Sequence, residues 1–310
     1  MKRRSLLATL VVLGILCALP LFLPRFYVYV ASIVLLTGLL ATSLNLAIGY
    51  GGIYQFHHTV FYGVGAYGTA LMLTRAGAPA PVAMIVGPLS AALLSLVMGV
   101  VCVRLSKLYF GMLQISLGSL VWVTVYRWYS FTGGDDGIHG VPLPDLIASA
   151  KGSYYYTLAV TALCLFAMRR IAGSPFGKTL QGIRDNPVRS EAIGVDVKLH
   201  KLVALVIAGF FGGVAGSLFV VVDTSVFPDM MFWTYSLEVL IMCLLGGMHT
   251  FWGPFVGSST LVLLRVFVSV YTQYWSLILG TILSLVIVFL PDGLLGFLVR
   301  RSIPKVDHGA

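Results

Sequence analysis

Charged residues are scarce in this chain of 310 residues: Asp, Glu, Lys and Arg make up 10% of it, whereas soluble domains carry roughly 25%. No polar stretch is long enough to build the core of a separate soluble domain, and 58% of the residues are hydrophobic. This composition excludes an ordinary soluble enzyme. We therefore predict an all-α polytopic membrane protein in which residues 1–310 form a single transmembrane domain.

Cysteine and clusters of metal-binding side chains are also scarce. The four cysteines lie inside apolar runs, so we expect neither disulfides nor metal ligation. His57 and His58 form a histidine pair, but no Cys, Asp or Glu lies close by in the sequence to complete a metal site. We predict that this pair lines a cavity or hydrogen-bonds between helices. The cysteines are Cys17, Cys102, Cys164 and Cys243.

Apolar runs long enough for membrane segments follow one another along the chain. We predict about ten, at residues 6–24, 27–48, 53–73, 81–103, 108–128, 154–168, 202–222, 231–245, 251–270 and 275–290. The first follows three basic residues, as in a signal peptide, but no cleavage site follows it, so we expect an uncleaved helix. The eighth run reaches only about 22 Å at 1.5 Å per residue. It falls short of the roughly 30 Å hydrocarbon core, so we expect it to be tilted, broken or re-entrant.

The distribution of Lys and Arg explains the net charge of +9 without a nucleic acid partner. If both termini lie in the cytoplasm, 15 of these residues fall inside and four fall outside, which fits the excess of basic residues in cytoplasmic loops. This topology makes residues 173–201 a cytoplasmic loop and residues 130–153 an external loop.

The cytoplasmic loop is predicted to form two short amphipathic helices. Ser174 is a suitable N-cap for the first, with Pro175 at its first position, and this helix should run to about Asp185. Asn186 and Pro187 should break it, and the second helix should span residues 188–193 before a stop at Gly194. An apolar face formed by Phe176, Leu180 and Ile183 is expected to dock on a partner protein.

Residues 173–179 (GSPFGKT) resemble a phosphate-binding loop. The nucleotide motif needs four residues between its glycines and a preceding strand. Here three residues separate the glycines, and the preceding segment is predicted to be a membrane helix. We therefore expect no nucleotide site in this loop.

Glycines interrupt the apolar runs at residues 49–52 and 246–250. Irregular backbone at membrane depth requires protein or a water-filled cavity around it, and such breaks often border transport sites; simple surface turns are the other interpretation. Glycine pairs at 209/213 and 212/216 predict close helix packing, or a helix face that borders a transport path.

Glu238 and Arg265 are charges within predicted spans. Their spans run in opposite directions, and both residues should lie about 8–10 Å below the outer surface. We predict that they pair or share a polar network. The alternative is that the Arg265 side chain reaches the outer membrane interface by itself, while Glu238 caps a helix or hydrogen-bonds locally.

Four stretches resemble the permease family of branched-chain amino acid ABC importers, of the LivM/LivH type, and favour the LivM-type member. Residues 52–67 (GIYQFHHTVFYGVGAY) are similar to its GQLSLGHAAFFGIGAY stretch, and residues 132–142 to its TGGxxGIxGIP loop. Residues 174–201 resemble its SPFGRALxAIR…EAxG segment. Residues 236–257 resemble its SIEVLLMVVLGGxGSLWGPxxG segment.

The resemblance implies a subunit of an ABC importer in the bacterial inner membrane, which forms the path for a branched-chain amino acid or related small solute. Its expected partners are a homologous second permease (LivH-like), two ATPases that bind ATP and Mg, and a soluble substrate-binding protein; this chain would bind no cofactor and catalyse no reaction. The residues coupled to the ATPase would be Phe176, Gly177, Leu180, Ile183, Arg184, Glu191 and Gly194. The candidates for the path are Gln55, His57, His58, Glu238, Gly246 and Gly247. An external lid or docking loop, rather than a simple connector, would contain Gly133, Gly134, Asp135, Asp136 and Gly137.

The sequence departs from this family at residues 55–58, where QFHH replaces SLGH. If this segment touches the cargo, the cargo need not be leucine, isoleucine or valine, because related importers carry urea, short amides and aromatic acids. A self-contained secondary transporter or channel is the competing hypothesis. It would need ionisable residues within the membrane, and it would leave the basic loop without a task.

Overall fold

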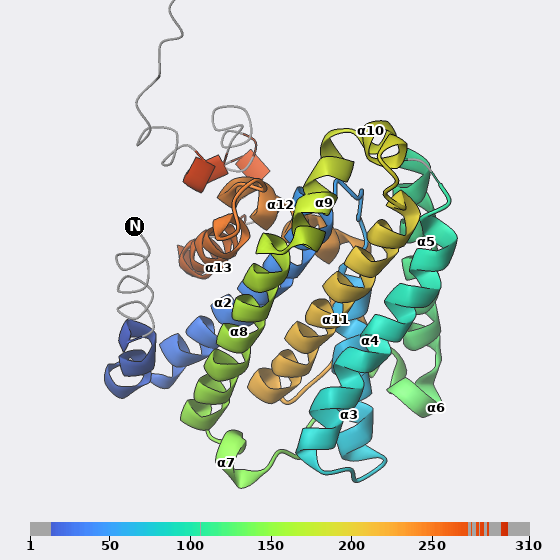
Figure 1. Ribbon diagram of the computed structural model, residues 1–310. Helices are drawn as coiled ribbons and strands as arrows, with labels where there is room; N and C mark the ends of the chain where they lie inside the picture. The colour runs from blue at the N-terminus through green and yellow to red at the C-terminus, as the bar shows by residue number, and fades with distance from the viewer. Residues whose placement is uncertain are drawn as a thin grey trace, which may run out of the picture.

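The computed structural model describes residues 14–105 and 107–271, together with residues 274, 277, 278, 280, 281, 284 and 293–296. All regular elements in these residues are helical (Figure 1). The first half of the chain contains α2 (Arg25–Asn45), the π-helical turn η1 (Leu46–Tyr50), α3 (Thr59–Thr74), α4 (Ala80–Cys102), α5 (Lys107–Arg127), α6 (Tyr129–Thr132) and the 3₁₀ turn η2 (Gly134–Asp136). The second half contains α7 (Asp145–Ala148), α8 (Ala150–Gly173), α9 (Pro175–Asp185), α10 (Pro187–Ala192), α11 (Val197–Asp223), η3 (Pro228–Met231), α12 (Trp233–Gly246) and α13 (Gly253–Tyr271).

The predicted all-α membrane architecture is confirmed in its coarse form. Six helices in the described residues are long and apolar enough to cross a membrane: residues 25–50, 80–102, 108–127, 150–173, 197–223 and 253–271. Helices α3 and α12 occupy two more of the predicted segments, and α12, with 14 residues, is short as expected. Residues 14–22 are helical within the first predicted segment. The rest of that segment, and most of the tenth, lie outside the described residues.

Two predicted boundaries are wrong. The third segment was expected from residue 53, but α3 begins only at Thr59 because residues 51–58 are irregular. The external loop was expected to extend to residue 153, yet it contains three short helical elements, and α8 already begins at Ala150. Ser149 caps α8, since its side chain accepts a hydrogen bond from the backbone N–H of Gly152 at 3.0 Å. A polar first turn therefore belongs to the helix and not to the loop.

Helix α11 is the centre of the bundle and packs most extensively on α4, α3 and α2 (Figure 1). Its glycines permit this approach. Side chains added at Gly209 and Gly213 would collide with Ser95 and Ala91 of α4, and one at Gly216 would collide with the backbone of α3. The packing interpretation of the two glycine pairs is thereby confirmed.

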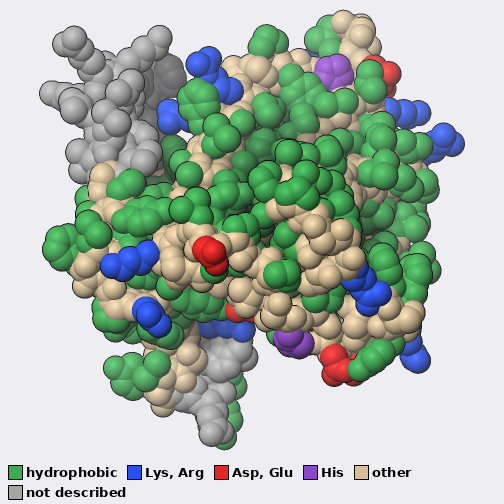
Figure 2. Space-filling model, turned by 90° about the horizontal axis from the view of Figure 1, so that it is seen from below, with side chains coloured by type: hydrophobic (Ala, Val, Ile, Leu, Met, Phe, Trp, Pro, Cys, Tyr) green, Lys and Arg blue, Asp and Glu red, His purple; other side chains and the backbone are tan. Residues whose placement is uncertain are grey.

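The surface of the spanning helices is apolar. Leu93 and Leu120, on α4 and α5, are 62% and 66% exposed, as expected for side chains that face lipid. Figure 2, seen from the end that carries α7, shows many hydrophobic side chains and few charged ones. The segment α9–α10 lies at the opposite end of the bundle (Figure 1), so the two loops of functional interest are separated by the length of the spanning helices.

Candidate functional site: two helix breaks, the α9–α10 segment and an ion pair

The first helix break follows η1, at residues 51–58, and buried histidines hold it in place. The ring nitrogens of His57 lie 2.7 Å from the carbonyl oxygen of Met231 and 3.2 Å from that of Ile115, so the ring bridges η3 and α5. The Nε2 atom of His58 lies 2.8 Å from the hydroxyl oxygen of Ser43 on α2. Of the two roles predicted for the pair, the structure therefore supports hydrogen bonding between elements.

Gln55 is the third polar residue of this break and is 1% exposed. Neither atom of its side-chain amide has a hydrogen-bond partner in the structure. Its backbone N–H donates to the carbonyl of Ile53 at 2.8 Å. The structure thus brings Gln55, His57 and His58 together in the interior, in irregular backbone before α3 and not within the span as predicted.

The second helix break separates α12 from α13, and it contacts the first. Gly247 has φ 108°, a conformation that favours glycine. The backbones meet at Gly49, where a Cβ atom would collide with the carbonyl of Met248. The side-chain amide of Asn45 also donates to the carbonyl of Thr250 at 3.3 Å. Gly246 packs against the start of α13, where any side chain would collide with the backbone of Gly253. Two breaks that are about 200 residues apart in the sequence therefore form one structural unit.

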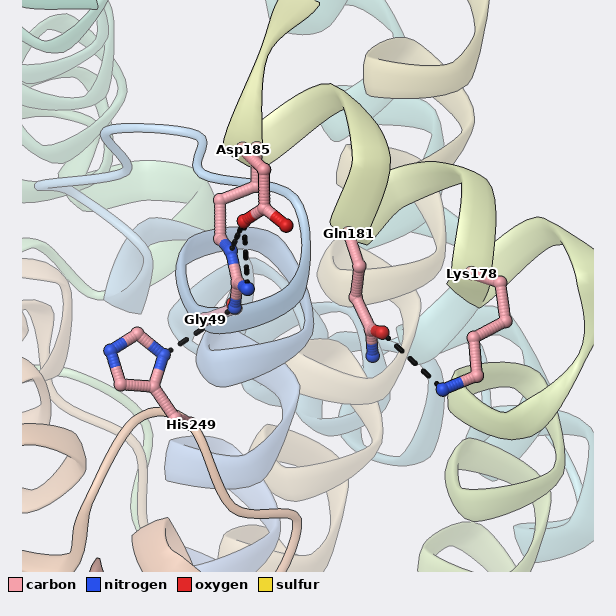
Figure 3. A network of polar contacts seen from close by, with 6 residues as sticks. Gly49, Lys178, Gln181, Asp185 and His249 are labelled. Atoms are coloured by element: carbon pink, nitrogen blue, oxygen red, sulfur yellow. Dashed lines mark hydrogen bonds and ion pairs between the residues drawn. The ribbon is translucent and has the colours of Figure 1, made fainter. Parts of the chain in front are cut away.

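Arg184, on α9, joins this unit to the α9–α10 segment (Figure 3). Its Nη1 atom donates to the carbonyl of Gly49 at 2.6 Å and lies 3.4 Å from Nδ1 of His249. Its Nε and Nη2 atoms donate to one carboxylate oxygen of Asp185, at 3.0 and 2.9 Å. Arg184 was among the predicted coupling residues, but the sequence carries no signal for its contacts with both breaks.

The segment α9–α10 has the predicted helix–break–helix form. Ser174 caps α9, with Pro175 at its first position, and Gly194 follows the second helix with φ 88°. Asn186 does more than end α9: its side chain accepts from the N–H of Arg189 at 3.0 Å, so it also caps α10, which begins at Pro187. The residues that resemble a phosphate-binding loop form this helix junction, and they are not preceded by a strand.

The prediction that the apolar face of α9 docks on a partner protein is wrong. Leu180 and Ile183 are 0% and 1% exposed, and Phe176 stacks on the His200 ring with centroids 5.8 Å apart. Leu180 belongs to a core cluster with residues of η1 and α11, and Gly177 packs on the end of α8. The apolar face of α9 is therefore covered by the chain itself. The exposed apolar side chains lie on and after α10 instead: Val188 is 74% exposed and Ile193 is 77% exposed. Glu191 and Gly194 are exposed beside them.

The predicted ion pair is present. Nη1 of Arg265, on α13, lies 3.3 Å from Oε1 of Glu238, on α12. The two side chains are 47% and 26% exposed. Two cavities of about 350 and 360 Å³ meet at this pair, and both are lined by Phe219 and Tyr235 as well as by the pair itself.

Comparison with known proteins identifies the family. The family model described as "Branched-chain amino acid transport system / permease component" matches residues 26–290. The chain belongs to this family.

Three curated relatives of this permease carry the LivM name. The high-affinity branched-chain amino acid transport system permease protein LivM of Escherichia coli (strain K12) is 26% identical, with 100% of this chain and 78% of the relative covered. Its counterpart in Salmonella typhimurium is 25% identical, over 95% and 75% of the two chains. A probable branched-chain amino acid transport permease protein LivM of Methanocaldococcus jannaschii is 22% identical, over 80% and 81%. No solved structure matches the chain.

The glycine-rich loop of this permease, residues 132–142, docks on the segment that follows α11. Ile138 and Val226 exchange two backbone hydrogen bonds of 2.9 and 2.8 Å, and Val141 donates to Thr224 at 3.0 Å. Positive φ angles at Gly133, Gly134 and Gly137 shape the loop, and Asp135 and Asp136 are exposed. Tyr129 donates a hydrogen bond to Asp136, which raises the pKa of the phenol. Two carboxylates are therefore displayed on an ordered loop.

Sequence reasoning missed several contacts of this permease. It missed the bridge from His57 to η3, the Arg184 contacts, and the exposure of Val188 and Ile193. All three depend on which segments meet in space. In the part of the chain that the structure describes, no group of three His, Cys, Asp or Glu is arranged to hold a metal ion.

Proposed function

We propose that this permease is the membrane-spanning subunit of a bacterial ABC importer and forms the path for a branched-chain amino acid or a related small solute. The observation that carries the proposal is the Arg184 contact, which ties a short cytoplasmic helix to both helix breaks. A partner protein that moved α9–α10 would therefore also move both breaks. An importer driven by a separate ATPase requires such a mechanical link. The names of its relatives support the solute class.

The ATPase would dock on α10. Val188 and Ile193 are the large apolar side chains of this segment that are exposed. Exposed apolar side chains on a short helix suit a hydrophobic groove on a partner. Arg189 and Glu191, both exposed, would form the polar rim of this contact. Two such ATPase subunits would bind ATP and Mg and hydrolyse ATP, and the permease itself would not.

A second, homologous permease would face α12 and α13. A half-exposed ion pair on spanning helices is costly against lipid, so it must meet protein or water. Its two cavities open to the surface of the chain, and a second permease would close them into a path between the subunits. The exposure of Arg265 and the partial exposure of Glu238 support this arrangement.

The proposed topology has ten crossings in the inner membrane, both termini in the cytoplasm, and residues 132–142 outside. The excess of Lys and Arg on the α9–α10 side supports it. The exposed Asp135 and Asp136 would meet the substrate-binding protein. An Asp136→Cys variant should react with an impermeant thiol reagent added from outside, and an Arg189→Cys variant should not. The reverse pattern would invert the topology.

Reconstitution tests the function as a whole. The permease, its partner permease, the two ATPases and the binding protein are placed in liposomes, and uptake of labelled L-leucine is measured with and without ATP. We expect uptake only with ATP and binding protein present. Uptake by this chain alone, driven by an ion gradient without ATP, would support a secondary transporter instead.

A further inference from the structure

The ion pair between Glu238 and Arg265 is placed where the two cavities meet, and these cavities differ in character. The cavity of about 350 Å³ has polar and apolar walls in about equal measure, and its polar residues include Asp229 and Thr234. The cavity of about 360 Å³ has mainly apolar walls, formed by Val30, Ile33, Met242, Val262 and Val266, with Tyr29 and Thr37 beside them. Each volume lies near the lower end of the range for small-molecule sites, about 300–1,000 Å³.

The geometry of the pair suits a ligand with two opposite charges. The 3.3 Å contact joins one guanidinium nitrogen to one carboxylate oxygen and is longer than a tight charge-assisted hydrogen bond, about 2.7–2.9 Å. A carboxylate has a second oxygen, and a guanidinium offers five N–H groups in a fork that fits another carboxylate. A molecule with an ammonium and a carboxylate on one carbon atom could lie alongside the pair, so that four charges alternate in sign.

We propose that Glu238 and Arg265 bind the ammonium and carboxylate groups of a zwitterionic amino acid, whose aliphatic side chain enters the apolar cavity beside α2 and α13. The proposal rests on the proposed function and names the substrate class of its path. Two features point the same way: opposite charges at a fixed spacing, and a branched aliphatic wall next to them. An uncharged solute such as urea or a short amide would hydrogen-bond to the pair but would bring no charge of its own to offset the desolvation of the two charged groups.

The orientation follows from the helices. The apolar cavity is lined by Val262 and Val266, which lie on α13 on either side of Arg265 along the chain, and by Met242, which lies one turn after Glu238 on α12. The charged groups of the ligand would therefore lie across the pair, and its side chain would point toward Val30 and Ile33 of α2. Tyr235 and Phe219 line both cavities, so their rings would border the ligand from the polar side to the apolar side.

The experiment uses the complete importer in liposomes with saturating binding protein, and it measures the maximal rate of L-leucine uptake. Glu238→Gln and Arg265→Gln should each lower this rate by about tenfold or more, since each removes one charge-assisted contact. ATPase binding and the monodispersity of the purified complex should be retained. Asp145→Asn, which removes an exposed carboxylate on α7, is the matched control and should transport normally.

A charge exchange separates ligand binding from a structural ion pair. The double variant Glu238→Arg with Arg265→Glu keeps a pair but reverses its direction relative to the apolar cavity. We expect it to assemble as the wild type does and yet to transport L-leucine at least about tenfold more slowly. Recovery of uptake in this double variant would show that the pair only holds α12 and α13 together, and would overturn the proposal.

Failure of the proposal and failure of the function have different signatures. If the wild-type complex takes up L-leucine and both single variants match its rate, the zwitterion site is wrong and the importer stands. If the wild-type complex takes up an uncharged amide and no amino acid, the substrate class is wrong. If it takes up nothing under ATP hydrolysis, the proposed function itself fails.

Discussion

Helices α9 and α10 are neighbours in one short segment, yet they face different surroundings. Leu180 and Ile183 of α9 are buried in the chain's own core, whereas Val188 on α10 and Ile193 directly after it are more than 70% exposed. Both helices begin with the same device, a capping polar side chain followed by proline. The difference teaches that the segment has two parts: α9 is fixed to the membrane domain, and α10 remains available for a partner.

This division also separates two physical tasks. A helix anchored through Arg184 to Gly49 and His249 can transmit displacement because its contacts with the membrane domain are short and direct. A helix with exposed apolar residues can gain affinity, because burial of apolar surface drives association. Variants of the two helices should therefore lose different properties of the permease, and the following predictions test that difference.

The largest effect is expected from Leu180→Asp. It would place an unpaired carboxylate in a fully buried site and destabilise the protein by about 4 kcal/mol or more. We expect the variant to be lost from the membrane or to aggregate, as seen by size-exclusion chromatography in detergent. Leu180→Met, which conserves volume, should cost less than about 1.5 kcal/mol. A well-folded Leu180→Asp protein that merely releases the ATPase would show that α9 is also a docking helix.

The next effect is expected on α10. Val188→Asp and Ile193→Asp should each weaken ATPase binding by about tenfold or more, because a charge replaces an apolar contact at the interface. Stability of the permease should stay within about 0.5 kcal/mol of the wild type, since both sites are exposed. Binding is measured by titrating the ATPase onto the purified permease pair. Leu146→Asp, an 85% exposed position on α7 at the opposite end, is the control. If Leu146→Asp weakened ATPase binding equally, the assignment of the ATPase contact to α10 would be wrong.

Arg184→Met should uncouple without releasing the ATPase. The change keeps much of the side-chain length and removes the hydrogen bonds to Gly49 and Asp185. We expect ATPase affinity within about twofold of the wild type and solute uptake per ATP hydrolysed reduced by about fivefold, the range of single coupling interactions. Arg184→Lys should be intermediate, because an ammonium cannot reproduce the fork. Unchanged uptake per ATP would show that force reaches the breaks by another route.

The smallest effect is expected from Lys178→Ala, on the exposed face of α9. The Nζ atom of Lys178 lies 3.4 Å from Oε1 of Gln181 (Figure 3), and such an exposed contact contributes little. ATPase affinity and uptake should both change by less than about twofold. A loss as large as that of Val188→Asp would extend the docking surface onto α9 and weaken the contrast between the two helices.

Much of the fold could be predicted because membrane helices have a strong local signal. Length and hydropathy located the spanning segments, and the caps at Ser174 and Gly194 were visible in the sequence. The pairing of Glu238 with Arg265 was also predictable, because a charge within a predicted span needs a partner and the predicted depths of these two residues matched. The start of α3 was missed, because the irregular backbone of residues 51–58 depends on tertiary hydrogen bonds, such as those of His57, which a sequence pattern does not show.

The sequence by itself determined the class of protein, the positions of its apolar segments and breaks, and the helix–break–helix form of α9–α10, because hydropathy, glycine, proline and capping residues act over a few residues. Only the tertiary structure decided which apolar faces are covered and which polar groups meet. An amphipathic helix has the same pattern whether its partner is its own chain or another protein, so α9 and α10 could not be told apart. The meeting of Gly49, His249 and Arg184 joins residues about 200 positions apart in the sequence, and such contacts follow from how the helices pack.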